Sequence, residues 1–363
     1  MDKGSYTYDA LWEKYDKFTE PSFEITVGGV ELASSKYNIP SLEVEISADG
    51  TAGGCSFTLE GQYNYEVSRW ENALTDLIKI GEKLVVRGGY VKKKELFYGY
   101  VDDYTIEFQR DGPPRIAVSG LDALGYLMCL REPMYAGQKK AAEIVKTILN
   151  KGVSAGFAKR VTVGRLLGFD TPILKEKIDD WKFLNLLAQR YGASLFVVDG
   201  ELIFDTLADQ TNPILTLHFG QELEFFTRRV SMAHQVGQVE IYGRDVNQQP
   251  VKGIASSVTA GSGKSAAELV PQLKQAVLRE YSEYARTQAE CKKLAQNRLN
   301  GIAMGLVSGQ GQCVGIPELI PGRYLKITGG DPESNGSYFL TKIRHIFAQQ
   351  GYVTAFEVKG AKI

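Results

Sequence analysis

The chain has 363 residues, of which 44% are hydrophobic and 23% are charged, and its formal net charge is −1. This length allows two or three domains that each bury a core, and the near-zero charge excludes a whole-molecule attraction to nucleic acid or to an anionic membrane. The sequence contains no apolar run of about 18 residues, so it predicts no membrane-spanning helix. Its polar N-terminal residues lack the features of a secretory signal peptide. We therefore expect a protein that folds in a cytoplasm.

Residues 1–20 predict an N-terminal arm or short helix, because Leu11, Tyr15 and Phe18 recur at helical spacing. From Ser22 the apolar period changes to two, and alternating runs separated by turn residues continue to about residue 129. This pattern is typical of half-buried strands, with a loop and some helix at 64–79. We predict a first β-barrel domain over 21–129.

A different pattern over 130–212 predicts a small α/β middle domain. A helical face ends at Gly152, and a second helix begins with Asp179 or Asp180 as its cap and ends at Gly192. Two strands then flank Asp199 and Gly200, a strong hairpin signal.

Strands return over 213–363, which we predict to be a second β-barrel domain. Its residues 252–265 are rich in glycine, serine and alanine and predict a mobile loop. Apolar residues near 3.6-residue spacing then predict a long helix at 271–302.

One pattern occurs twice. A strand, a glycine pair, a polar loop and two further strands extend from Gly81 to Gly120, and again from Gly322 to Gly360. Chance similarity between hairpins is the alternative, but the matched spacing favours an internal duplication. The positions that match in the first strand are Gly81, Leu84, Gly88 and Gly89 against Gly322, Leu325, Gly329 and Gly330.

No catalytic, cofactor-binding or metal-binding residues are predicted, and no cofactor is expected. The three histidines, His218, His234 and His345, are isolated, so no metal-ligand spacing occurs. Asp102 and Asp103 are adjacent in a predicted strand, where solvated acidic pairs are common. The segment 261–265 ends like a phosphate-binding loop but lacks its first glycine. Four cysteines are expected to be small buried hydrophobes; they are Cys55, Cys129, Cys291 and Cys313.

Residues 79–90, 95–108 and 113–127 resemble the first barrel of the phage late control protein D family, which includes baseplate hub proteins of contractile tails and is similar to the N-terminal hub of VgrG-type spikes. Residues 316–360 resemble the end of its second barrel, and residues 181–204 resemble its middle domain. The positions that fit the second-barrel pattern are Pro321, Gly322, Gly336, Tyr338 and His345.

The resemblance implies a non-enzymatic, homotrimeric hub in which two barrels per chain form a pseudo-sixfold ring. Such a ring joins a hexameric tail tube to a trimeric spike, contacts other baseplate proteins, and needs neither specific nucleic-acid binding nor membrane insertion. Because the sequence ends after the second barrel, we expect a separate spike protein. The implied place is the baseplate of a tail or injection particle assembled in a bacterial cytoplasm. The alternatives are a peripheral receptor-binding tail protein and a tail-associated cell-wall hydrolase.

Overall fold

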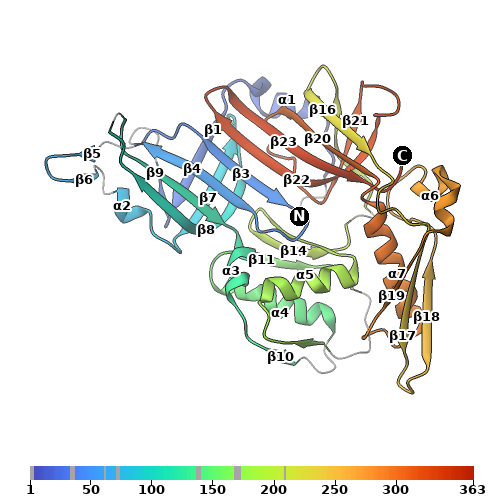
Figure 1. The fold of residues 1–363 in the computed structure, drawn as a ribbon. Helices are drawn as coiled ribbons and strands as arrows, with labels where there is room; N and C mark the ends of the chain where they lie inside the picture. Colours follow the sequence, from blue (N-terminus) through green and yellow to red (C-terminus); the bar gives the residue numbers. More distant parts are fainter. Residues whose placement is uncertain are drawn as a thin grey trace.

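The computed structural model describes residues 4–32, 37–60, 63–70, 74–110, 112–135, 140–166, 173–207 and 210–363. The chain is mainly β, as its alternating runs predict, and Figure 1 shows two β units side by side with the helical middle region beneath them. No helix in the described part of the chain is long and apolar enough to cross a membrane.

The first unit begins with an arm that contains helix α1 (Tyr8–Lys14). A small hairpin and a one-turn helix fill the predicted loop near 64–79; they are β5 (Tyr63–Asn64), β6 (Arg69–Trp70) and α2 (Leu74–Leu77). The strands of its sheet are β1 (Ser22–Val27), β2 (Val30–Glu31), β3 (Leu42–Ser47), β4 (Gly54–Glu60), β7 (Lys83–Gly89), β8 (Lys93–Glu107) and β9 (Arg115–Leu121).

The middle region folds as its local signals predict. Asp179 caps the second of its long helices through the amide of Lys182, and Gly192 ends that helix in the left-handed conformation, with φ of 64°. The hairpin turn has positive φ at both Asp199 and Gly200, which matches the right-handed twist of its strands. The elements are α3 (Ala123–Cys129), β10 (Met134–Tyr135), α4 (Ala141–Ser154), β11 (Arg160–Val163), β12 (Leu174–Lys175), α5 (Asp180–Tyr191), β13 (Ser194–Val198) and β14 (Glu201–Asp205).

The second unit contains an insertion between two of its sheet strands. The unit comprises β15 (Pro213–His218), β16 (Leu223–Val230), β20 (Val307–Val314), β21 (Tyr324–Thr328), β22 (Gly336–Ala348) and β23 (Gly351–Gly360). The insertion comprises β17 (Gln238–Arg244), β18 (Pro250–Ala255), α6 (Ala266–Leu269), a 3₁₀ turn (Pro271–Gln275), β19 (Val277–Tyr281) and α7 (Gln288–Ala303). Part of the predicted loop at 252–265 is therefore strand.

The predicted helix at 271–302 is wrong in its first half. Residues 277–281 form strand β19, which pairs in parallel with β17, a partner about 40 residues away in sequence. The helix begins only at Thr287, whose hydroxyl accepts from the amide of Glu290 while the Glu290 carboxylate accepts from the amide of Thr287. This capping box fixes the start of the helix. Most of the apolar residues before it lie in the 3₁₀ turn and in β19.

The two units share one 13-stranded sheet, with the order β16-β20-β23-β22-β3-β4-β9-β8-β7-β1-β2 and with β21 and β15 branching from β22. Among the described residues this order does not return on itself, so the predicted closed barrels are not found. The reason is the length of β22: its start pairs with β21 and its end pairs with β3. One large apolar core extends across both units, while the middle region and the insertion each have their own.

Candidate functional site

The two β units have the same strand order. Six strands of the first unit follow the order β3-β4-β9-β8-β7-β1, and the second unit follows β16-β20-β23-β22-β21-β15. The two-residue strand β2 extends the first unit beyond β1. The long middle strands, β8 and β22, each contain a register shift partway along their length. The outermost pairs differ, since β1 lies antiparallel to β7 whereas β15 lies parallel to β21.

Strands β22 and β3 join the units through six residue pairs, from Lys342 opposite Ser47 to Phe347 opposite Leu42. Basic side chains on β22 meet acidic side chains on β3. The Lys342 ammonium lies 2.9 Å from the Glu45 carboxylate, and a second pair, Arg344 with Glu43, has a separation of 3.6 Å. We call this contact the internal junction.

The buried face of the internal junction is aromatic. The ring of Phe347 stacks on that of Tyr352 at a centroid distance of 3.9 Å and contacts the ring of Phe23 from the first unit at 5.4 Å. A Cβ atom at Gly88 would come within 2.6 Å of the Phe347 ring, so this position needs glycine. The junction is therefore a packed interface between the units as well as a set of backbone hydrogen bonds.

His345 lies inside the internal junction and is neutral there. A hydrogen bond of 2.8 Å joins its Nδ1 to the Tyr352 hydroxyl. Burial, helped by the nearby positive charge of Lys94, lowers the pKa of His345 to about 3. A buried neutral histidine with a hydroxyl partner packs the core, so this residue has a structural position.

The terminal strands β2 and β15 each have one neighbour in the large sheet. Two further strand edges also lack a partner strand in the described part of the chain. On β8, the edge next to β7 is free beyond Val101, because β7 pairs only as far as Tyr100 and a further amide bond joins Val101 to Glu82. Strand β16 pairs with β20 alone. Figure 1 shows these two edges toward opposite ends of the molecule.

Both free edges carry exposed apolar side chains, but their charged side chains differ. Asp102 and Asp103 are exposed on β8, whereas β16 has an exposed Arg229, a half-buried Arg228 and an exposed Glu224 nearer its start. The exposed apolar side chains are Tyr104 and Ile106 on β8, with Phe108 directly after it, and Phe225 and Val230 on β16, with Met232 two residues after it. The acidic pair predicted as a solvated strand feature therefore lies on a sheet edge.

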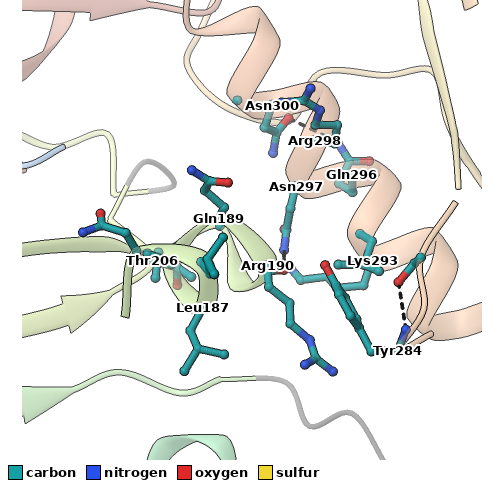
Figure 2. Close-up of a pocket in the computed structure, with 18 of the residues that line it drawn as sticks. Leu187, Gln189, Arg190, Thr206, Tyr284, Lys293, Gln296, Asn297, Arg298 and Asn300 are labelled. Carbon is teal, nitrogen blue, oxygen red and sulfur yellow. Dashed lines mark hydrogen bonds between the residues drawn. The ribbon is translucent and has the colours of Figure 1, made fainter. Parts of the chain in front are cut away.

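A polar cavity of about 960 Å³ lies between α5 and α7, and Figure 2 shows its side chains. The Arg190 guanidinium stacks 3.8 Å from the centroid of the Tyr284 ring, and burial lowers the pKa of Arg190. The Asn297 amide donates to the Arg190 carbonyl oxygen at 3.2 Å. The lining also includes Lys293, Ser282 and the carboxylates of Glu280 and Glu283, so it offers hydrogen-bond donors and acceptors.

The loop that ends like a phosphate-binding loop has other partners. Lys264 exchanges two backbone hydrogen bonds with Ile363, of 2.7 and 3.0 Å. Ser265 caps the short helix α6, and the Glu268 carboxylate accepts from its amide and its hydroxyl. A carboxylate thus occupies the helix start where a phosphate would bind.

The other residues that the sequence singled out lie apart. His218 is 3.8 Å from Glu222 near the end of β15, and His234 has positive φ in a turn. In the described ranges no three His, Cys, Asp or Glu side chains lie close enough together to hold a metal. The cysteines are all free; Cys55, Cys291 and Cys313 are buried and Cys129 is exposed.

A family model described as the Alg8 N-terminal domain matches residues 18–349. A comparison with curated protein sequences gives no match. Among solved structures, a tail protein from Neisseria meningitidis MC58 aligns with a TM-score of 0.68 and 14% identity, over 94% of this chain and 97% of that chain. The 43 kDa tail protein of prophage MuSo2 from Shewanella oneidensis aligns with a TM-score of 0.69 and 16% identity, over 93% and 98% of the two chains.

The E. coli c3393 protein, described as a component of the type VI secretion system with structural similarity to the T4 tail proteins gp27 and gp5, is also similar. It aligns with a TM-score of 0.58 and 13% identity, over 92% of this chain and 76% of that chain. These likenesses show that the chain shares the fold of tail and secretion-system proteins.

Proposed function

The chain belongs to the Alg8 N-terminal domain family, and we propose that it is a structural hub of a contractile tail or injection machine. In this proposal three copies form a ring that joins a hexameric tail tube to a trimeric spike made by a separate protein. The ring contacts further baseplate proteins and belongs to the late control protein D group of hubs. Its place is the baseplate of a particle that assembles in a bacterial cytoplasm.

The observation that carries this proposal is the strand order that the two units share within one continuous sheet. Two similar units per chain support an origin by duplication. A ring of three such chains presents six similar units, which suits a sixfold partner on one side and a threefold partner on the other. The fold shared with tail proteins and with a secretion-system component supports the same role.

We also propose that the role is binding without catalysis. Asp102 lies exposed on a sheet edge, and His345 is buried and neutral, so neither has the setting of a general acid or base. Purified protein incubated with peptidoglycan should release no glycan or peptide fragments. Cleavage that disappears in the Asp102→Asn variant would contradict this part of the proposal and favour the cell-wall hydrolase.

The test of the hub is the composition and structure of the parent particle. Cryo-electron microscopy should show three copies of the chain as a ring between tube and spike. Particles from a strain that lacks the gene should have no spike attached to the tube. Tube and spike that remain joined without this chain would overturn the hub, and density at the distal fibres would favour a receptor-binding protein.

A further inference from the structure

We propose that the free edge of β8 in one copy of the chain pairs with the free edge of β16 in the next copy. This contact repeats between copies what the internal junction does within one chain. The inference rests on the proposed function, because it names the surface through which hub copies associate.

The first step is topological. In the shared strand order, β8 corresponds to β22 and β16 corresponds to β3. The part of β22 beyond its contact with β21 is covered by β3. The same part of β8, beyond its contact with β7, is uncovered, and so is the outer edge of β16. Each copy therefore has one strand end that lacks a partner and one edge strand that could supply it. An unpaired edge presents amide and carbonyl groups that template pairing with another chain.

The second step concerns apolar burial. At the internal junction, Ile343 and Phe347 of β22 are 0% and 3% exposed. The corresponding half of β8 instead presents Tyr104 and Ile106, which are 37% and 38% exposed. Phe108, directly after the strand, is 58% exposed even though its ring contacts that of Tyr63 at 5.1 Å. Large apolar side chains that are exposed next to one another on a strand form a surface that another protein can cover. The matching residues on β16, named above, give that partner an apolar surface of its own.

The third step concerns charge, which decides which edges can meet. The internal junction pairs basic β22 with acidic β3. Between copies the signs are exchanged, because the β8 edge has Asp102 and Asp103 while the far half of β16 has the exposed Arg229. Two β8 edges would place like charges together, and directly opposed like charges destabilise strand pairs.

Attraction therefore favours β8 against β16, and repulsion disfavours pairing of β8 with itself. Such a head-to-tail contact generates a closed ring when the rotation between copies closes. Because the two edges point toward opposite ends of the molecule (Figure 1), one copy can engage a neighbour on each side at once.

The test measures oligomer mass for the full chain and three edge variants. Light scattering after size exclusion should give the wild type a mass near three times 40.1 kDa. The variants Asp103→Arg and Arg229→Glu should each weaken association by roughly tenfold or more. The double variant, in which the signs are exchanged, should recover most of the loss. Lys146→Glu, a charge reversal on the exposed face of α4, is the matched control and should leave the mass unchanged.

Hydrogen exchange locates the contact independently of the variants. Amides of residues 103–107 and 224–230 should be slowly exchanging in the oligomer and fast in the dissociated single variants. Circular dichroism should be the same for all chains, since both substituted side chains are exposed.

A wild-type monomer, or an oligomer that both single variants leave intact, would overturn the edge pairing. Neither result would remove the chain from the baseplate, because cryo-electron microscopy of the particle tests the hub separately. A ring found there with these two edges apart would overturn this inference and leave the hub standing.

Discussion

A buried charge cluster in the middle region provides the sharpest prediction about stability. The Asp180 carboxylate forms ion pairs with the ammonium groups of Lys175, at 2.7 Å, and Lys151, at 2.8 Å. The side chains of Asp180 and Lys175 are both 0% exposed, whereas that of Lys151 is 25% exposed. We predict that Asp180→Asn, which keeps the size and removes the charge, strongly destabilises the protein.

The size of the stability loss depends on the partners that each lysine keeps in the variant. In the variant, Lys175 keeps only the carbonyl oxygen of Glu132, at 2.6 Å, and stays buried without a countercharge. Lys151 keeps the Glu132 carboxylate at 3.3 Å and reaches water, so it contributes little. Removing one partner of a buried ion pair costs about 3–5 kcal/mol, and we assign most of that to Lys175.

Urea denaturation followed by tryptophan fluorescence measures this loss. Trp181 is next to Asp180 and donates to the carbonyl oxygen of Gly50 at 2.6 Å, so it reports on this region. The double variant Lys175→Met with Asp180→Leu should be more stable than Asp180→Asn, since it leaves no buried charge unpaired. A loss below about 1 kcal/mol for Asp180→Asn would refute the view that Lys175 depends on this carboxylate.

Three further predictions concern the contacts between the units. The pKa of His345 is lower in the folded protein than in the unfolded chain, so the unfolded chain binds a proton more readily. The contribution of His345 to stability should therefore fall as the pH drops from about 6.5 toward 3. The His345→Gln variant should show a weaker loss of stability over this pH range. Gly88→Ala should cost roughly 1–3 kcal/mol in thermal unfolding by displacing Phe347, and an unchanged midpoint would contradict the close packing. Glu318, 1% exposed, accepts from the Tyr15 hydroxyl at 2.7 Å, so Glu318→Leu should loosen the N-terminal arm and speed its cleavage by trypsin; equal cleavage rates would show that the arm is held by its other contacts.

If the edges of β8 and β16 join copies, the large sheet is the element that carries force from one unit to the next. The internal junction combines six residue pairs, two ion pairs and an aromatic core. Such a contact resists shear better than loop contacts, because many hydrogen bonds must break together.

The sequence by itself determined the local structure of this protein. The hairpin at Asp199 and Gly200 requires a turn with positive φ, and the helix limits at Asp179 and Gly192 are caps whose chemistry is complete within a few residues. The repeated pattern likewise predicted two similar strand meanders, because strand period and glycine position are local properties. For the same reason the mainly β character was readable in advance.

Tertiary structure alone decided how the units are joined. Barrel closure failed as a prediction because the far half of β22 pairs with β3, a strand about 300 residues earlier in the chain. Residues 277–281 form strand β19 despite their helical apolar spacing, because they pair with β17, a segment about 40 residues earlier in the chain. The polar cavity exists because α5 and α7 meet, and Asp102 became an edge residue because β7 ends too soon to cover it. Which distant strands pair depends on the packing of the whole chain, so the apolar periodicity within one segment cannot predict it.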